Sequence, residues 1–292
     1  MVDMNKGKDK LVERLRSNTE RGSILWRLVR PVVRPVWSLI HNRDYVSDYD
    51  RDYYLYHGCV LPPRELRGRL GASFLADGFY LESGIAEARR LAARLAYSKS
   101  SLVVDIGCGL GRLATGMLWE FGDVQYFGID SNPTFAEWCR EHIERNHPSF
   151  RFIHLDVVNE LYNPTGKIDG DRIRLPLADA TADIVYLWGL FTNMGPEHVR
   201  IYVSEMSRIA REGSRIFLTA FVEENVPEVS FIPKGYLPYE CDKPLQCVRY
   251  SKEFLFSIFS RYGLVVEEFR HHGGAFPSQS EVYLRKELKV AA

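Results

Sequence analysis

The chain has 292 residues, with 38 basic and 38 acidic side chains, so its formal net charge is zero. This balance argues against a dedicated nucleic-acid binder, which usually carries a basic surplus. Apolar residues make up 46% of the sequence, and no run approaches the roughly 18 apolar residues of a membrane span. We therefore expect a soluble globular protein with one large domain or two small ones.

The cysteine content indicates a reducing compartment. The number of cysteines is odd, and their spacings match no zinc-binding pattern. The first residues are polar and charged, without the apolar core of a signal peptide. We expect a cytoplasmic protein with reduced thiols at Cys59, Cys108, Cys139, Cys241 and Cys247.

Residues 1–83 are predicted to form an N-terminal arm and cap, followed by a main domain over residues 84–292. Residues 23–40 read SILWRLVRPVVRPVWSLI and mix tryptophans, aliphatic residues and arginines. Two interpretations stay open for this stretch. It could attach to an anionic membrane surface or a partner, which would make the protein membrane-associated, or it could pack on the body of the protein.

From residue 84 onward, an amphipathic helix over 84–97 precedes an alternation of apolar runs and helical patterns. Such alternation implies crossover connections and a doubly wound α/β fold whose parallel strands are covered on both faces. The predicted strands cover 102–105, 125–130, 150–155, 183–188 and 215–221, and the predicted helices cover 112–121, 133–146 and 196–209.

The last part of the chain departs from this alternation. A proline-containing insertion covers about residues 222–248, and a further helix is expected at 251–262. Two strands, 264–269 and 281–285, follow with no helix between them. We expect these two strands to pair antiparallel at the edge of the sheet.

Three glycines, Gly107, Gly109 and Gly111, directly follow the first predicted strand, which carries Asp105. In open parallel sheets, ligands bind beyond the carboxyl ends of the strands. The dinucleotide fingerprint fails here because Arg112 stands where a glycine or alanine is needed, and no Gly-Lys-Ser/Thr of a phosphate loop follows.

The pattern D-x-G-x-G-x-G resembles motif I of the class I S-adenosylmethionine-dependent methyltransferases. The resemblance implies a Rossmann-like, seven-stranded, mostly parallel sheet with an antiparallel final strand. It also implies S-adenosylmethionine as cofactor, with the loop against its amino-acid part and Asp105 on its ammonium group. The corresponding loop contacts are Gly107, Cys108, Gly109 and Gly111.

Asp130 ends the second predicted strand, and Ser131 follows it in the expected cofactor site. A carboxylate offers two acceptor oxygens, which suits the two hydroxyls of a ribose. The sequence DSNP before a helix is also good N-cap chemistry. Both roles are compatible if Ser131 or Asn132 caps the helix.

Two further features agree with the resemblance. Asp156 and Val157 follow the third strand, where the family binds adenine, although a solvated loop acid is the alternative for Asp156. Trp188 and Gly189 end the fourth strand beside the expected cofactor, where Trp188 or Phe191 could wall the cofactor or pack as a core residue. The sequence GLFTNM at 189–194 is similar to S-x-F-T-H-M of many small-molecule and sugar methyltransferases, but Asn193 replaces its histidine.

Methyl transfer depends mainly on alignment of the reacting atoms, and a general base adds to it when the acceptor is a hydroxyl. The candidate bases are His198 and His271, each with a surface or packing role as the alternative. We predict no metal, because Trp188 and Gly189 stand where a magnesium-dependent scheme needs an acid, and no His/Cys cluster has zinc spacing.

We therefore expect methyl transfer to a hydroxyl of a sugar, glycolipid or secondary metabolite, with no nucleic-acid partner. The amine-methylation motif N/D-P-P-Y/F is absent after the fourth strand. Aromatic residues in 44–84 and in the insertion suggest a lid over the acceptor. Two alternatives stay open: a methyltransferase acting on protein or RNA, and a non-catalytic cofactor-binding subunit. A homodimer is one possible assembly.

Overall fold

The computed structural model describes residues 53–236, 243–272 and 278–288. The predicted arm at 23–40 and Cys241 lie outside these ranges. The chain divides into two compact units, Met1–Pro63 and Arg64–Ala292. The described part of the first unit is an antiparallel hairpin of β1 (Tyr54–Tyr56) and β2 (Cys59–Leu61).

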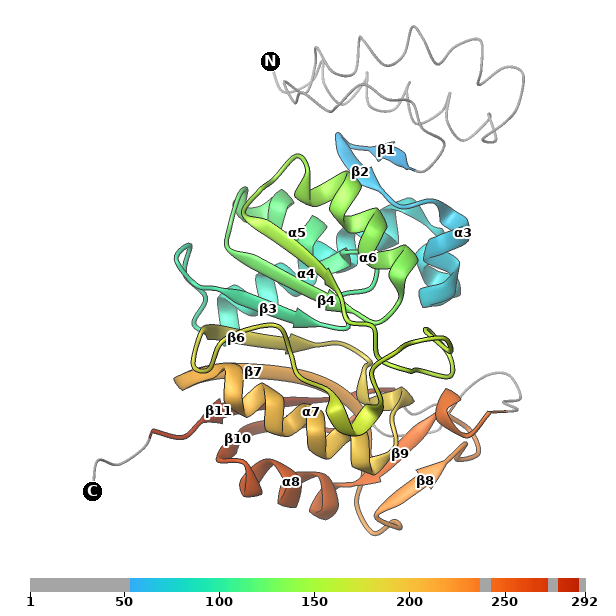
Figure 1. Cartoon of the computed structure of the whole chain (residues 1–292), viewed down its shortest axis with the longest axis vertical. Helices are drawn as coiled ribbons and strands as arrows, with labels where there is room; N and C mark the ends of the chain where they lie inside the picture. The colour runs from blue at the N-terminus through green and yellow to red at the C-terminus, as the bar shows by residue number, and fades with distance from the viewer. Residues whose placement is uncertain (1–52, 237–242, 273–277, 289–292) are drawn as a thin grey trace, which may run out of the picture. The chain divides into compact units, whose positions relative to one another are not determined.

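The second unit is built on one mixed sheet with the strand order β10-β11-β7-β6-β3-β4-β5 (Figure 1). Strands β3 to β7 pair in parallel, and β11 runs antiparallel to both of its neighbours. The predicted fold class, including the antiparallel final strand, is confirmed. The bounds are β3 Val103–Ile106, β4 Tyr126–Asp130, β5 Phe150–His154, β6 Ala182–Leu187, β7 Ala210–Glu223, β10 Leu264–Arg270 and β11 Ser280–Lys286.

The insertion after β7 extends this sheet. It contains β8 (Val229–Phe231), and β9 (Val248–Ser251) follows it directly. Strand β9 runs parallel to the end of β7, and β8 pairs antiparallel with β9. Part of the segment predicted as a lid is therefore sheet structure.

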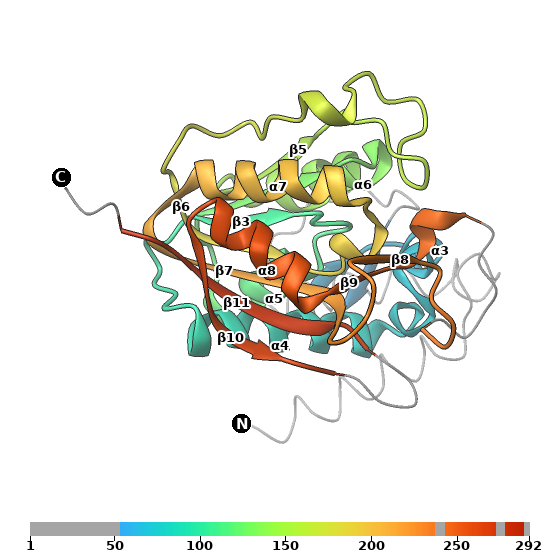
Figure 2. The same cartoon turned by 90° about the horizontal axis from the view of Figure 1, so that it is seen from below.

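Helices cover both faces of the sheet, with α4 and α5 on one face and α7 and α8 on the other (Figure 2). Asn132 caps α6, because its side chain accepts a hydrogen bond from the Phe135 amide. A π-helical turn, Arg140–Glu144, continues α6. The bounds are α3 Arg64–Arg67, α4 Asp77–Arg94, α5 Arg112–Phe121, α6 Pro133–Cys139, α7 Pro196–Ile209 and α8 Lys252–Arg261.

The boundary predicted at residue 83/84 differs from the structure. Helix α4 begins at Asp77 because the turn before Gly84 also faces the core, where Tyr80 and Leu81 are buried. Two short 3₁₀ turns, η1 (Gly68–Leu70) and η2 (Ala72–Leu75), connect α3 to α4. Residues 64–83 therefore belong to the compact unit that holds the sheet, and we call residues 64–76 the cap segment.

The four described cysteines are buried free thiols. Among the described residues, no helix is both long enough and apolar enough to cross a bilayer.

Helices α4 and α5 cross at two glycines whose backbones touch. A Cβ atom on Gly116 would lie 2.0 Å from the carbonyl oxygen of Gly84, and a Cβ on Gly84 would lie 2.3 Å from the Arg112 carbonyl oxygen. Neither glycine has a positive φ. The close approach of the two helices, rather than backbone conformation, therefore requires glycine here.

We predict that Gly116→Ala destabilises the protein, because the new methyl group must push α4 away from α5. Overpacking of this kind costs about 1–3 kcal/mol, which lowers Tm by about 2–12 °C in a domain of this size. The control is Gly195→Ala, since a Cβ there meets no atom within 4 Å. Equal Tm values for the two variants in thermal unfolding would contradict the helix contact.

Candidate functional site

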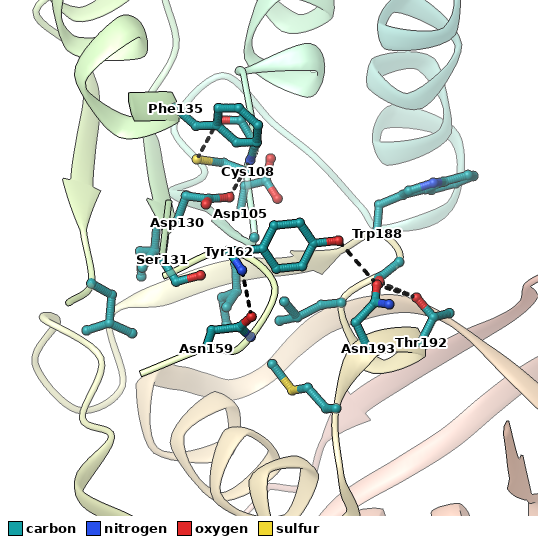
Figure 3. A pocket seen from close by; sticks show the side chains of 18 of the residues that line it. Asp105, Cys108, Asp130, Ser131, Phe135, Asn159, Tyr162, Trp188, Thr192 and Asn193 are labelled. Atoms are coloured by element: carbon teal, nitrogen blue, oxygen red, sulfur yellow. Dashed lines mark hydrogen bonds between the residues drawn. The ribbon is translucent and has the colours of Figure 1, made fainter. Parts of the chain in front are cut away.

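A cavity of about 310 Å³ opens at the carboxyl ends of β3, β4 and β6 (Figure 3). Its walls come from the segments after these strands, from the cap segment and from α7. The sequence-predicted residues that line it are Asp105, Gly107, Cys108, Gly109, Asp130, Ser131, Val157, Trp188, Gly189 and His198.

The glycine loop after β3 is held against the end of β4. The amides of Gly107 and Cys108 donate to the Ile129 carbonyl at 2.8 and 3.0 Å. Gly109 has φ +55° and Gly111 has φ +72°, in the left-handed region that favours glycine. Gly111 does not line the cavity but immediately precedes α5, where a Cβ would lie 2.7 Å from the Ile143 side chain.

The Asp130 carboxylate links this loop to α6. Its Oδ2 accepts the Gly109 amide and its Oδ1 accepts the Asn132 amide, each at 2.7 Å. The helix cap itself is Asn132, as one of the sequence alternatives allowed. Each carboxylate oxygen can accept a second hydrogen bond, so Asp130 retains capacity for two hydroxyl groups. Burial raises the pKa of Asp130, and the two backbone hydrogen bonds oppose that rise.

Asp105 lies deeper, 3% exposed, and accepts a hydrogen bond from the Tyr126 hydroxyl at 2.5 Å. Burial raises the pKa of Asp105 to about 7, against the lowering effects of that hydrogen bond and of Arg112. An ammonium group entering the cavity would favour the ionised form of this carboxyl. The site thus offers one buried acid for a cation and one for hydroxyls.

The predicted adenine pair is not arranged as expected. Asp156 does not line the cavity, and its carboxylate accepts the Asn163 side-chain amide at 3.0 Å. Val157 does line it, but its backbone amide donates to the Leu155 carbonyl at 2.7 Å. The cause is local, since β5 ends at His154 and a β-bridge between Val157 and Ile168 closes the following loop. The adenine contact stays a prediction.

Trp188 and Gly189 line the cavity where β6 ends. The Trp188 ring packs on Phe217 with a centroid distance of 6.2 Å, and it is half-buried rather than enclosed in the core. The Gly189 amide donates to Thr219 Oγ1 at 2.8 Å, which joins the end of β6 to β7. This position allows Trp188 to contact a bound molecule.

The two candidate bases lie in different surroundings. His198, near the start of α7, lines the cavity. His271 is exposed and does not line it, and its Nε2 lies 2.7 Å from the Glu223 carboxylate. The structure therefore brings His198, and not His271, to the other predicted site residues.

Asn193 is fixed in one orientation. Its Nδ2 donates to the carbonyls of Leu245 and Gln246, each at 3.0 Å. Its Oδ1 accepts the Thr192 hydroxyl at 3.2 Å and lies 3.5 Å from the Tyr162 hydroxyl (Figure 3). Asn193 therefore presents a hydrogen-bond acceptor at the cavity, but no base.

Comparison with known proteins supports the resemblance seen in the sequence. Residues 103–213 match a family described as a methyltransferase domain. This region is a methyltransferase domain. S-adenosylmethionine, the cofactor that the resemblance implies, fits Asp105, the glycine loop and Asp130, because they offer one buried acid for its ammonium and one for its ribose.

Two curated relatives match different shares of this chain. The chain is 28% identical over 131 residues to a probable chloroplastic tocopherol O-methyltransferase from Oryza sativa subsp. japonica. That match covers 45% of this chain and 32% of the relative, so it spans about a third of the relative's length. The chain is also 24% identical over 209 residues to a tRNA (guanine-N(7)-)-methyltransferase from Streptococcus suis (strain 05ZYH33). This second match covers 70% of this chain and 82% of the relative.

Solved structures agree on the fold. A chain in the complex between the Haloferax volcanii Trm112 methyltransferase activator and a putative methyltransferase superposes with a TM-score of 0.52 at 17% identity, over 73% of this chain and 95% of that one. Geranyl diphosphate methyltransferase in complex with GPP and sinefungin gives 0.50 at 15% identity, over 73% and 81%.

Several residues that line the cavity were not assigned to the site from the sequence: Arg69, Arg112, Tyr162, Tyr202 and Gln279. Gln279 arrives only because β11 pairs with β7, where Thr219 donates to its side-chain oxygen at 2.5 Å. The insertion enters the site only indirectly, since none of its described residues lines the cavity, although two of its carbonyls orient Asn193. Its role as a lid stays a prediction.

The Asp105 carboxyl gives the cofactor affinity a pH dependence. Its raised pKa leaves it neutral below about pH 7 and ionised above, and only the ionised form attracts an ammonium group. We predict that S-adenosylhomocysteine binds roughly tenfold more weakly at pH 6 than at pH 8, measured by calorimetry. Asp105→Asn should largely abolish this difference, and a wild-type affinity that does not change with pH would contradict the assignment.

Proposed function

We propose that the protein transfers a methyl group from S-adenosylmethionine to a hydroxyl of a small molecule: a sugar, a glycolipid or a secondary metabolite. One observation carries the proposal. Beside the cofactor-side acids, the same cavity is lined by neutral polar side chains and by aromatic rings. The polar side chains are Tyr162, Asn193 and Gln279, and the rings are Phe74 and Trp188.

This lining suits a neutral hydroxyl on a ring or an apolar body. Aromatic walls exclude water and contact ring faces, while a few fixed polar groups set the orientation of a ligand. The Asn193 Oδ1 can accept a hydrogen bond from a hydroxyl of the acceptor molecule, because the amide nitrogen already donates to two carbonyls. A hydroxyl held this way is fixed in orientation.

When bound, S-adenosylmethionine supplies a methyl group already activated by the sulfonium charge. The protein's contribution is therefore mainly alignment, which can lower a barrier by about 7–11 kcal/mol. Asp105 would hold the ammonium of the cofactor, and Asp130 would hold its ribose. Trp188 would line the cavity next to the acceptor. His198 lines the cavity and can take the proton that the hydroxyl loses.

Relatives support more than one acceptor class. The rice relative and the geranyl diphosphate enzyme are named for small-molecule acceptors. The Streptococcus suis relative is named for tRNA, which keeps an RNA acceptor as the second candidate. The zero net charge of this chain counts against RNA, because phosphate binding needs a basic surface.

The experiment that tests the function is a labelled methyl-transfer assay. Purified protein, methyl-labelled S-adenosylmethionine and a cell extract are incubated, and the products are separated by size. The proposal expects label in the small-molecule or lipid fraction, resistant to protease and ribonuclease. Label in RNA would favour the second candidate, label in protein would contradict both candidates, and no label at all would favour a non-catalytic subunit.

The two histidines provide a matched pair of variants. We predict that His198→Ala lowers kcat by about 10²–10⁴-fold if the imidazole removes the proton, the usual range for a general base. His271→Ala should leave kcat within a factor of two or so, because His271 pairs with Glu223 and does not line the cavity. Equal effects of the two substitutions on kcat would contradict this assignment.

A further inference from the structure

The Arg112 guanidinium lies in the cavity wall between two aromatic side chains. Its Cζ is 5.1 Å from the centroid of the Trp188 ring and 5.6 Å from that of Phe74. Arg112 is only 9% exposed, yet it lines the cavity. Among the described residues, no carboxylate or other acceptor forms an ion pair or hydrogen bond with it.

The two acids that interact electrostatically with Arg112, Asp105 and Glu87, are engaged by other groups. Asp105 accepts a hydrogen bond from the Tyr126 hydroxyl at 2.5 Å. Glu87 accepts a hydrogen bond from the Tyr186 hydroxyl at 2.9 Å and forms an ion pair with Arg90 at 3.0 Å. Both acids still attract Arg112 at longer range. The aromatic faces also attract a cation, but they offer no oxygen to its five N–H donors. A buried guanidinium in this state favours an anionic ligand.

A second guanidinium, that of Arg69, lines the same cavity from η1. It is exposed and, within the described ranges, also has no ion pair. Its neighbour Leu70 lies over the glycine loop, 3.4 Å from where a Cβ of Gly109 would stand. S-adenosylmethionine carries one carboxylate, whereas the cavity wall carries two guanidinium groups that form no ion pair with any described residue.

We infer that the methyl acceptor carries an anionic group, a carboxylate or a phosphate, which binds the Arg112 guanidinium beside Trp188. This inference rests on the proposed function and narrows its substrate class. Guanidinium groups pair with carboxylate and phosphate through two parallel hydrogen bonds, which fixes orientation as well as charge. The rings of Trp188 and Phe74 then favour a flat or apolar body next to the acid.

The test uses benzoate and its neutral counterpart benzamide as probes on wild-type protein saturated with S-adenosylhomocysteine. Calorimetry or ligand-observed NMR gives the two affinities. We expect benzoate to bind at least tenfold more tightly than benzamide. Equal binding of the two probes would overturn the inference, and this comparison needs no variant that must fold.

Variants then locate the site. Arg112→Gln should reduce benzoate binding to the level of benzamide, and Arg112→Lys should give an intermediate value because it keeps the charge but loses the paired donors. The matched control is Arg151→Gln on β5, since the Arg151 side chain is 62% exposed, pairs with Glu144 and does not line the cavity. Benzoate binding that persists in Arg112→Gln would also overturn the inference.

A second arm separates the acceptor's acid from the cofactor's own carboxylate. Arg112→Gln should bind S-adenosylhomocysteine and 5′-methylthioadenosine, which lacks the amino-acid part, with the same affinity ratio as the wild type. A selective loss of S-adenosylhomocysteine affinity would assign Arg112 to the cofactor and overturn the inference. The proposed function is tested separately by the labelled methyl-transfer assay, and its outcome does not depend on the affinity for benzoate.

Discussion

The Asp130 carboxylate holds the site together. It joins two backbone segments that follow neighbouring parallel strands: its oxygens accept the amides of Gly109, in the loop after β3, and of Asn132, at the start of α6. Because parallel strands end at the same edge of the sheet, one short side chain can reach both segments. The same carboxylate lines the cavity, so the group that shapes the loop also faces the ligand.

The other side of the loop depends on the cap segment and α4. The Tyr80 hydroxyl donates to the Leu110 carbonyl at 2.8 Å, and buried Arg67 forms an ion pair with Asp77 at the start of α4. The glycine contact between α4 and α5 keeps the two helices close enough for this arrangement. Leu70 and Phe74 consequently lie at the cavity, where they bring aromatic and apolar surface to the mouth of a charged site.

The sequence predicted the parts of the site that depend on local patterns. Apolar runs located six of the predicted strands to within a few residues, whereas β7 is longer than predicted and β8 and β9 were not predicted at all. Pro196 marked the start of α7 where the structure has it. Asp105, the glycine loop and Asp130 share a short motif and two strand ends, so their meeting followed from the fold alone. Their contacts with a bound cofactor remain predictions.

Other parts depend on contacts that no local pattern records. Asp156 has the expected place after β5, but it does not line the cavity, and its carboxylate accepts a hydrogen bond from the Asn163 side chain instead. Gln279 reaches the site only through the pairing of β11 with β7. Arg112 was noted only as a misfit in a glycine motif, and its role emerges from Trp188 and Phe74, which come from distant segments.

The central claim is that Asp130 binds a ribose while it also shapes the loop. The most direct test compares wild type and Asp130→Ala by calorimetry with S-adenosylhomocysteine, adenosine and 2′,3′-dideoxyadenosine. The account predicts that the variant binds S-adenosylhomocysteine at least tenfold more weakly, about 1.4 kcal/mol, and no longer prefers adenosine over the dideoxynucleoside. Unchanged affinity, or a preference for adenosine that persists in the folded variant, would contradict the account.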